Sequence, residues 1–172
     1  MDIDGENPRR LTNNDARDER PFLSPDGTRI LFMSNRDGNY EIYTMAPDGS
    51  GQTRMTNTTE WEIFPTWSPD GRRIAYAQKF RAGGRLEGSI RVMDADGSSD
   101  HQVTATETRD ENPMWSPDGR FIVFQSVRDG NFEVYRIDAD GSNPLRLTDQ
   151  PAWDGWASFA PWPTRAPKPD PV

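Results

Sequence analysis

The 172-residue chain contains no cysteine and a single histidine, His101. Without cysteine, the chain can form neither a disulfide framework nor a thiolate metal site. One histidine leaves little for a nucleophile–base pair or for a zinc site built from imidazoles. No asymmetric set of acid, base and nucleophile stands out, so we expect this chain not to be an enzyme.

Long hydrophobic runs and excess positive charge are also lacking. Hydrophobic residues make up 33% of the chain, and no apolar run approaches the length of a membrane span. The first residues, MDIDGENPRR, are polar, so no signal peptide is visible. The formal net charge of −8 disfavours non-specific binding to nucleic acid or to anionic membranes. We therefore expect no nucleic-acid partner and no membrane insertion.

Turn-forming residues are abundant, and they recur in fixed phrases. Ser-Pro-Asp-Gly begins at Ser24, Ser68 and Ser116, with spacings of 44 and 48 residues. Asp-Gly-Ser begins at 48, 96 and 140, with the same two spacings in reverse order. The second unit carries four extra residues within QKFRAGGRLEGS, which we interpret as a loop insertion. Repetition at this period is typical of repeat architectures such as propellers.

Each unit contains four short runs rich in β-branched and aromatic residues, which predicts four strands. The second run is apolar at consecutive positions, as in ILFM at 30–33. A strand with one solvated face would alternate, so both faces of each sheet must be covered. We predict an all-β fold, a β-propeller of four-stranded antiparallel blades with three full blades and parts of a fourth.

The repeat boundaries predict one domain over residues 1–161 and a Pro-rich tail over 162–172. The full blades are expected at about 17–56, 61–104 and 109–148. Three blades do not easily close a ring, and an open end would expose apolar sheet faces. We favour self-association, in which two copies complete one ring. The alternatives are that the chain is a piece of a longer propeller or forms a compact four-bladed monomer.

Four carboxylates occupy equivalent places, three residues before the proline position of each first run: Asp18, Glu62, Asp110 and Asp154. In a propeller they would lie at the start of the innermost strands, around one end of the channel. Oxygen-rich clusters suit Ca²⁺ or Mg²⁺, and negative charge suits a basic partner segment. Alternatively, each carboxylate caps a local turn or pairs with Arg17, Arg109 or another neighbour.

Three tryptophans lie beside these carboxylates: Trp61, Trp153 and Trp156. Aromatic residues next to charges are typical of protein and peptide hot spots, and indole faces can also stack on sugars. The equivalents of Trp61 are Arg17, Arg109 and Trp153, which counts against a lectin with identical sites in every blade.

Two further tryptophans, Trp67 and Trp115, lie inside the first runs, and we predict that they belong to the core. His101 lies in the fourth run of its unit, where we predict a surface position. Arg36 and Arg128 precede the turn between the second and third runs, and we expect each to pair with an acidic neighbour.

The segments PTWSPDGRRIAYAQ and PMWSPDGRFIVFQSVRDGNFEVYRIDADGSNPLRLT resemble the WD-like propeller repeat of the TolB family. The resemblance covers residues 1 to about 161, although Leu23 replaces the tryptophan of the first unit and the second unit lacks the Arg-Asp-Gly turn. It implies a propeller, commonly periplasmic or extracellular, that binds protein partners. The same repeat also occurs in peptidases of the prolyl oligopeptidase type, beside a separate hydrolase domain.

Together these features predict a non-catalytic scaffold that binds a protein or peptide at the channel mouth. The expected contact residues are the four carboxylates, Arg17, Arg109 and the three tryptophans beside them. No cofactor is expected, although the carboxylates leave Ca²⁺ or Mg²⁺ possible. The alternatives are a carbohydrate- or cation-binding propeller, or the regulatory propeller of a hydrolase that lacks its catalytic domain.

Overall fold

The computed structural model describes residues 7–105, 108–155, 157 and 159, which form three four-stranded antiparallel sheets. The first sheet contains β1 (Asp18–Leu23), β2 (Ile30–Ser34), β3 (Glu41–Met45) and β4 (Thr53–Arg54). The second contains β5 (Trp61–Trp67), β6 (Arg73–Ala82), β7 (Arg85–Asp94) and β8 (His101–Gln102). The third contains β9 (Asp110–Trp115), β10 (Phe121–Ser126), β11 (Glu133–Asp138) and β12 (Leu145–Arg146).

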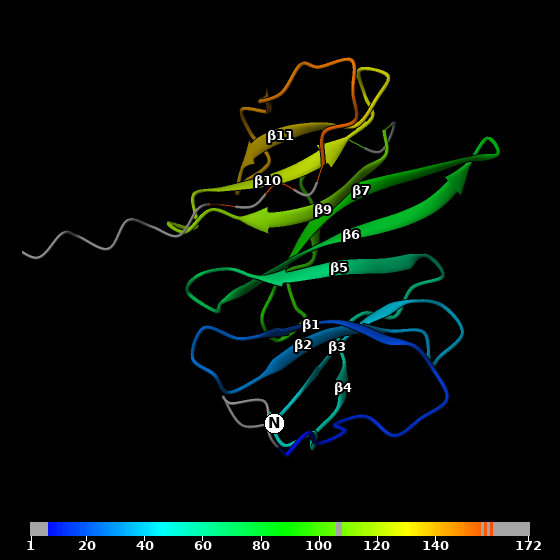
Figure 1. Cartoon of the computed structure of the whole chain (residues 1–172), viewed down its shortest axis with the longest axis vertical. Helices are drawn as coiled ribbons and strands as arrows, with labels where there is room; N and C mark the ends of the chain where they lie inside the picture. Colours follow the sequence, from blue (N-terminus) through cyan, green and yellow to red (C-terminus); the bar gives the residue numbers. More distant parts are fainter. Residues whose placement is uncertain (1–6, 106–107, 156, 158, 160–172) are drawn as a thin grey trace, which may run out of the picture.

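The strands of each sheet lie in chain order, and the sheets follow one another along the longest axis of the molecule (Figure 1). This arrangement confirms the predicted all-β architecture of four-stranded antiparallel blades. No helix in the described part of the chain is long and apolar enough to cross a membrane.

The Ser-Pro-Asp-Gly phrase forms the turn between the first and second strands of each sheet. In the first copy, the Ser24 hydroxyl donates to Asp26 Oδ1 at 2.6 Å, and the Gly27 N–H donates to the Ser24 carbonyl at 2.9 Å. The second and third copies repeat both bonds. Gly27 has a φ of 72°, in the left-handed region that glycine adopts without steric cost. The repeated phrase therefore has a structural role.

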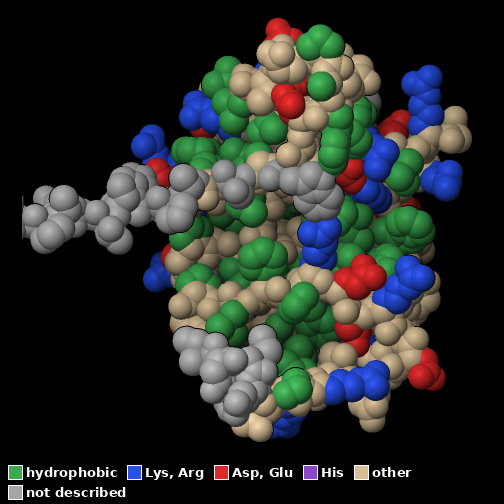
Figure 2. Space-filling view, viewed as in Figure 1, with side chains coloured by type: hydrophobic (Ala, Val, Ile, Leu, Met, Phe, Trp, Pro, Cys, Tyr) green, Lys and Arg blue, Asp and Glu red, His purple; other side chains and the backbone are tan. Residues whose placement is uncertain are grey.

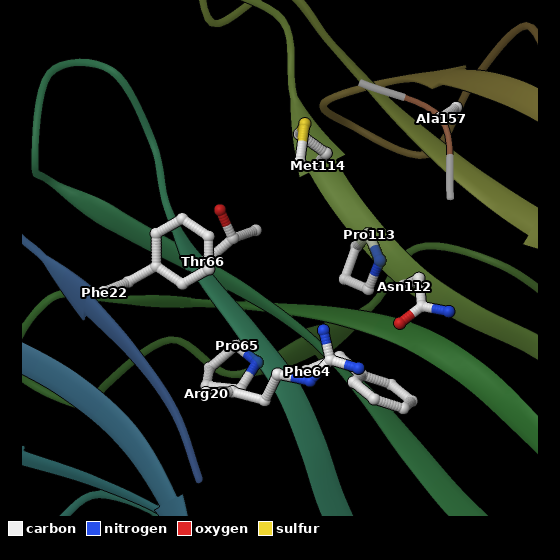
Figure 3. Close-up of a pocket in the computed structure, with 9 residues that line it drawn as sticks. All are labelled: Arg20, Phe22, Phe64, Pro65, Thr66, Asn112, Pro113, Met114 and Ala157. Atoms are coloured by element: carbon white, nitrogen blue, oxygen red, sulfur yellow. The ribbon is translucent and has the colours of Figure 1, made fainter. Parts of the chain in front are cut away.

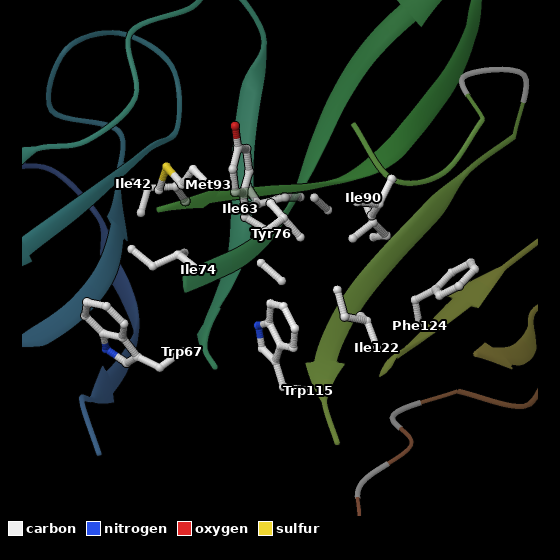
Figure 4. Close-up of a cluster of buried hydrophobic side chains, with 14 of the residues drawn as sticks. Ile42, Ile63, Trp67, Ile74, Tyr76, Ile90, Met93, Trp115, Ile122 and Phe124 are labelled. Carbon is white, nitrogen blue, oxygen red and sulfur yellow. The ribbon is translucent and has the colours of Figure 1, made fainter. Parts of the chain in front are cut away.

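A continuous hydrophobic core fills the spaces between neighbouring sheets (Figure 4). Trp67 and Trp115 are buried in it, which confirms the prediction made for them. The guanidinium of Arg29, from the first sheet, lies 4.9 Å from the Trp67 ring centroid, and Arg73 lies 4.5 Å from that of Trp115. These cation–π contacts link each sheet to the next.

An aromatic pair continues this series beyond the third sheet. Phe121 stands at the repeat position of Arg29 and Arg73, and Phe159 stands at that of Trp67 and Trp115. The two phenylalanine rings contact each other with centroids 5.7 Å apart. The chain after β12 thus packs against the third sheet at the place where another blade would begin.

The four extra residues of the second unit lengthen the hairpin of β6 and β7. This finding corrects the expectation that they form a loop. Strands β6 and β7 pair without interruption from Arg73↔Asp94 to Ala82↔Arg85. Gly83 and Gly84, with φ of 55° and 81°, form the two-residue turn. Two left-handed residues match the twist of a hairpin, so the ladder extends to its tip. The long hairpin projects beyond the neighbouring sheets in Figure 1.

Glycines of the Asp-Gly-Ser turns allow close approach between successive units. A β-carbon at Gly49 would lie 2.7 Å from the carbonyl oxygen of Leu11, and one at Gly141 would lie 3.0 Å from that of Val103. Leu11 and Val103 occupy equivalent positions one unit earlier in the chain. The backbone of one unit therefore packs directly on the turn of the next.

We expect Gly49→Ala to destabilise the protein more than Gly51→Ala does. Both glycines have positive φ, so alanine costs about 1–2 kcal/mol at either position. Only Gly49 faces a neighbouring carbonyl, and the resulting overlap should add about 1–3 kcal/mol. Urea unfolding of both variants measures the difference. Equal destabilisation would show that the contact between Gly49 and Leu11 does not constrain the stack.

Candidate functional site

Each inner strand contains a bulge at the same repeat position. Arg20, Phe64 and Asn112 have φ of 56°, 56° and 54°, and each precedes a proline. The pairing of the inner strand with its neighbour shifts register at these residues in all three sheets. Left-handed backbone costs a residue with a side chain about 1–2 kcal/mol. Bulges of this kind redirect side chains.

The redirected side chains line a cleft between the inner strands, with a volume of about 130 Å³ (Figure 3). The guanidinium of Arg20 lies 5.0 Å from the ring centroid of Phe64. The lining residues come from β1, β5, β9 and the chain after β12: Arg20, Phe22, Phe64, Pro65, Thr66, Asn112, Pro113, Met114 and Ala157. One sequence signal for this cleft was the residue–proline pair repeated in each inner strand, but the cleft was not predicted from it.

Two of the predicted carboxylates are ion-paired within their own sheets. Asp18 Oδ1 lies 2.8 Å from Arg36 Nη2, and Asp110 Oδ2 lies 3.0 Å from Arg128 Nη2. These pairs confirm that Arg36 and Arg128 bind acidic neighbours. Burial raises the pKa of Asp18, but hydrogen bonds led by Ser34 and Arg36 outweigh it and lower that pKa to about 2.

The second sheet lacks this arginine. Phe80 stands at the repeat position of Arg36 and Arg128, because the second unit has no Arg-Asp-Gly turn. No ion pair to Glu62 is present among the described residues. The equivalent carboxylates therefore differ in their electrostatic environment from sheet to sheet.

Glu62 is fully buried and hydrogen-bonded through one oxygen. Its Oε1 accepts from Thr58 Oγ1 at 2.7 Å and from Gln78 Nε2 at 2.9 Å, whereas Oε2 has no partner among the described residues. Burial and the neighbouring carboxylate of Glu41 raise the pKa of Glu62 to about 7, against the effect of Thr58 and Gln78. Protonation of Glu62 removes both the cost of burying its charge and the repulsion from Glu41.

Glu62 and Asp110, which the sequence predicted to contact a partner, are both fully buried. No group of three or more acidic or imidazole side chains in the described residues is placed to hold a metal ion. Asp154 is half-buried, and its backbone N–H donates to the Phe132 carbonyl at 2.8 Å. Asp18, Glu62 and Asp110 therefore lie in three separate sheets, and Asp154 lies in the chain after β12.

Trp61 and Trp153 remain exposed, with 47% and 54% of their surface accessible. The Trp61 ring packs edge-on against Tyr40 with centroids 6.4 Å apart, and Trp153 packs in the same way against Phe132 at 6.2 Å. Each indole thus keeps one fixed edge contact and offers much of its surface to solvent. Trp156 lies outside the described residues.

Arg17 and Arg109, the two arginines predicted to contact a partner, lie in different environments. Arg17 is exposed, and its backbone N–H donates to Asn35 Oδ1 at 2.9 Å. Arg109 pairs with Glu111 at 3.2 Å and lies 5.1 Å from the Phe132 ring centroid. Arg109 therefore lies beside Phe132, the residue whose ring packs against Trp153.

A buried ion pair that the sequence did not indicate joins the second and third sheets. Lys79 Nζ contacts Glu111 Oε2, and both side chains are buried. Burial lowers the pKa of Lys79, and Glu111 opposes this effect. The Lys79 ammonium also lies 5.3 Å from the Phe64 ring centroid, so the pair supports one wall of the cleft.

The stacked sheets and inner-strand bulges define a protein of the β-propeller repeat class. A family model described as TolB beta propeller domain matches residues 1–88 and 67–161. The chain therefore belongs to the TolB beta propeller domain family. No curated protein sequence matches the chain.

Solved structures agree with this family. The putative TolB from Agrobacterium tumefaciens is 31% identical, with a TM-score of 0.66 over 77% of this chain and 47% of that one. TolB from Acinetobacter baumannii is 23% identical, with a TM-score of 0.73 over 89% of this chain and 37% of that one. The tricorn protease is similar in fold, at 20% identity and a TM-score of 0.61, over 73% of this chain and 14% of that one. The chain thus spans less than half the length of each structure.

We expect Glu62→Gln to change the pH dependence of stability. Because the folded-state pKa of Glu62 is raised to about 7 from 4.5, the folded state binds more protons between these values. Wild-type stability should therefore fall as pH rises from about 4.5 through 7, by on the order of 2 kcal/mol from this group. Glutamine carries no charge, so the variant should lose this decline.

Urea unfolding across this pH range measures the effect, with Glu60→Gln as the control at a more exposed carboxylate two residues away. The control should keep the wild-type profile. If the Glu62→Gln variant also keeps the wild-type pH profile, protonation of Glu62 does not cause the decline in stability.

Proposed function

We propose that this chain is a non-catalytic TolB-like propeller module that binds a protein or peptide partner. The partner contacts the face that carries Trp61 and Trp153, at the start of the inner strands. The observation that supports this proposal is the exposure of both indoles, 47% and 54%, at equivalent positions in the second and fourth units. Exposed aromatic side chains anchor many protein interfaces.

Preorganisation supports a binding role for these tryptophans. Tyr40 and Phe132 hold the two indoles edge-on, which reduces the conformational entropy that binding would cost. Arg109 lies beside Phe132 and brings a guanidinium to the same face. Rigid aromatic anchors next to an arginine are the combination that interface hot spots favour.

The cleft between the inner strands offers a second place for a partner to bind. Phe22, Phe64 and Met114 give it apolar walls, and Arg20 and Asn112 supply polar groups. Its volume of about 130 Å³ suits a side chain of a partner better than a whole cofactor. We infer from the similarity to TolB that the protein works in the periplasm or outside the cell.

Self-association is a second part of this proposal. Leu11, Met55 and Val103 each face the Asp-Gly-Ser glycine of the following unit. Leu147 is the next member of this series, and 48% of its surface is exposed. A second copy that covers the third sheet would bury Leu147 and extend the stack toward a ring.

We expect Trp61→Ala and Trp153→Ala to weaken peptide binding without unfolding the protein. Peptides selected by the wild-type chain from a random displayed library serve as probes. Loss of a hot-spot indole costs about 2 kcal/mol or more, which corresponds to about 30-fold weaker binding by fluorescence anisotropy.

Leu145→Ala is the matched control, because Leu145 is an exposed apolar residue on the outermost strand of its sheet. This variant should bind like the wild type. Peptides that bind both tryptophan variants as tightly as the wild type would contradict the proposed surface.

We expect Leu147→Lys to shift the chain toward the monomer. A charged side chain at the centre of an apolar contact adds a desolvation cost without a partner. Light scattering on a size-exclusion column, over a range of concentrations, measures the mass. A monomeric wild-type chain would overturn self-association, whereas a Leu147→Lys variant of unchanged dimeric mass would overturn Leu147 as part of the contact.

A further inference from the structure

A large polar cleft lies between the outer parts of the second and third sheets, away from the exposed tryptophans. It has a volume of about 690 Å³. Three arginines, one histidine and two aspartates contribute its charged and polar lining: Arg73, His101, Arg120, Arg136, Asp138 and Asp140. We call this site the arginine cleft.

The arginines of this cleft are not held in direct ion pairs with carboxylates of the described residues. Among the described residues, Arg73, Arg120 and Arg136 form no ion pair. Arg73 stacks on Trp115, and Arg136 lies 5.3 Å from the ring centroid of Phe121. The Nε atom of Arg136 is buried without a hydrogen-bond partner in the described part of the chain. Stacking thus positions two guanidinium groups that form no ion pair within the described part of the chain.

The repeat shows that the fold does not require these cations. Thr28 stands where Arg120 stands, in the corresponding turn of the first unit. Thr44 and Val92 occupy the position of Arg136 in the first and second units. The blade architecture therefore accepts neutral residues at both places. Arg136 is specific to this cleft, whereas the second unit also carries an arginine, Arg72, at the position of Arg120.

The two aspartates are already engaged in the turn after β11. Asp138 Oδ2 accepts from Asn143 Nδ2 at 2.8 Å. Asp140 Oδ1 accepts from the backbone N–H and the hydroxyl of Ser142, at 2.9 and 2.6 Å. Carboxylate oxygens can accept further hydrogen bonds, so they suit a ligand that also carries hydroxyl donors.

We propose that the arginine cleft binds a phosphorylated small molecule that carries hydroxyl groups, of the sugar-phosphate class. Guanidinium groups bind phosphate through paired N–H donors, and Arg73, Arg120 and Arg136 supply them here. The aspartates accept from the hydroxyls. A volume of about 690 Å³ lies within the range of small-molecule sites. This proposal does not depend on the function proposed for the tryptophan face.

Isothermal titration of the full chain at constant ionic strength tests the proposal. The probes are glucose 6-phosphate, ribose 5-phosphate and glycerol 3-phosphate, with glucose, inorganic phosphate and citrate as comparisons. We expect saturable binding of at least one sugar phosphate, tighter than that of inorganic phosphate, and none of glucose. No saturation by any phosphorylated probe up to about 10 mM would overturn the site. Tightest binding of citrate would overturn the phosphate class.

Two variants connect binding to the cleft. Arg120→Thr and Arg136→Thr install residues that the first unit carries at the same positions, so both should fold, as urea unfolding checks. Each should weaken binding about tenfold, because one charge-assisted contact is lost.

Arg72→Thr makes the same substitution at the position equivalent to Arg120, one unit earlier, and should bind like the wild type. Equal binding by wild type, Arg120→Thr and Arg136→Thr would place the ligand elsewhere and overturn the proposal.

Discussion

The structure depends on the burial of each sheet against its neighbours. The middle strands are apolar at consecutive positions, and Leu31, Ile74 and Ile122 are fully buried. Side chains of a strand alternate between the two faces, so a single sheet can bury only half of such a strand. Stacking removes the other half from water, at about 25 cal/mol for each Å² of apolar surface. The cation–π contacts and the glycine contacts between units all follow from this arrangement.

Repetition made most of the fold predictable. The spacing of Ser-Pro-Asp-Gly predicted the number of sheets, and its hydrogen bonds are local, so they form the same turn in every copy. The direction of the inner-strand carboxylates was not predictable. It depends on a bulge whose left-handed residue precedes a proline, against the local preference of the backbone. The repeat placed Glu62 and Asp110 correctly at the start of the inner strands. It did not show that their side chains are buried.

Departures from the repeat give each unit its own electrostatics and surface. The second unit replaces Arg36 by Phe80, and no cation pairs with Glu62 among the residues that the structure describes. The first and third units lack the long hairpin of β6 and β7. Arg136 appears only in the third unit, where it completes the arginine cleft. Positions that all units share hold the sheets together, whereas positions that differ are available for recognition.

Native-state hydrogen exchange tests most directly whether each sheet depends on its neighbours. At a concentration where the chain is monomeric, the amides of β6 and β7 should exchange more slowly than those of the flanking sheets. Of the three sheets that the structure describes, only the second lies between two complete sheets of the same chain. Faster exchange in the second sheet, or equal rates in all three sheets, would contradict the dependence of each sheet on stacking.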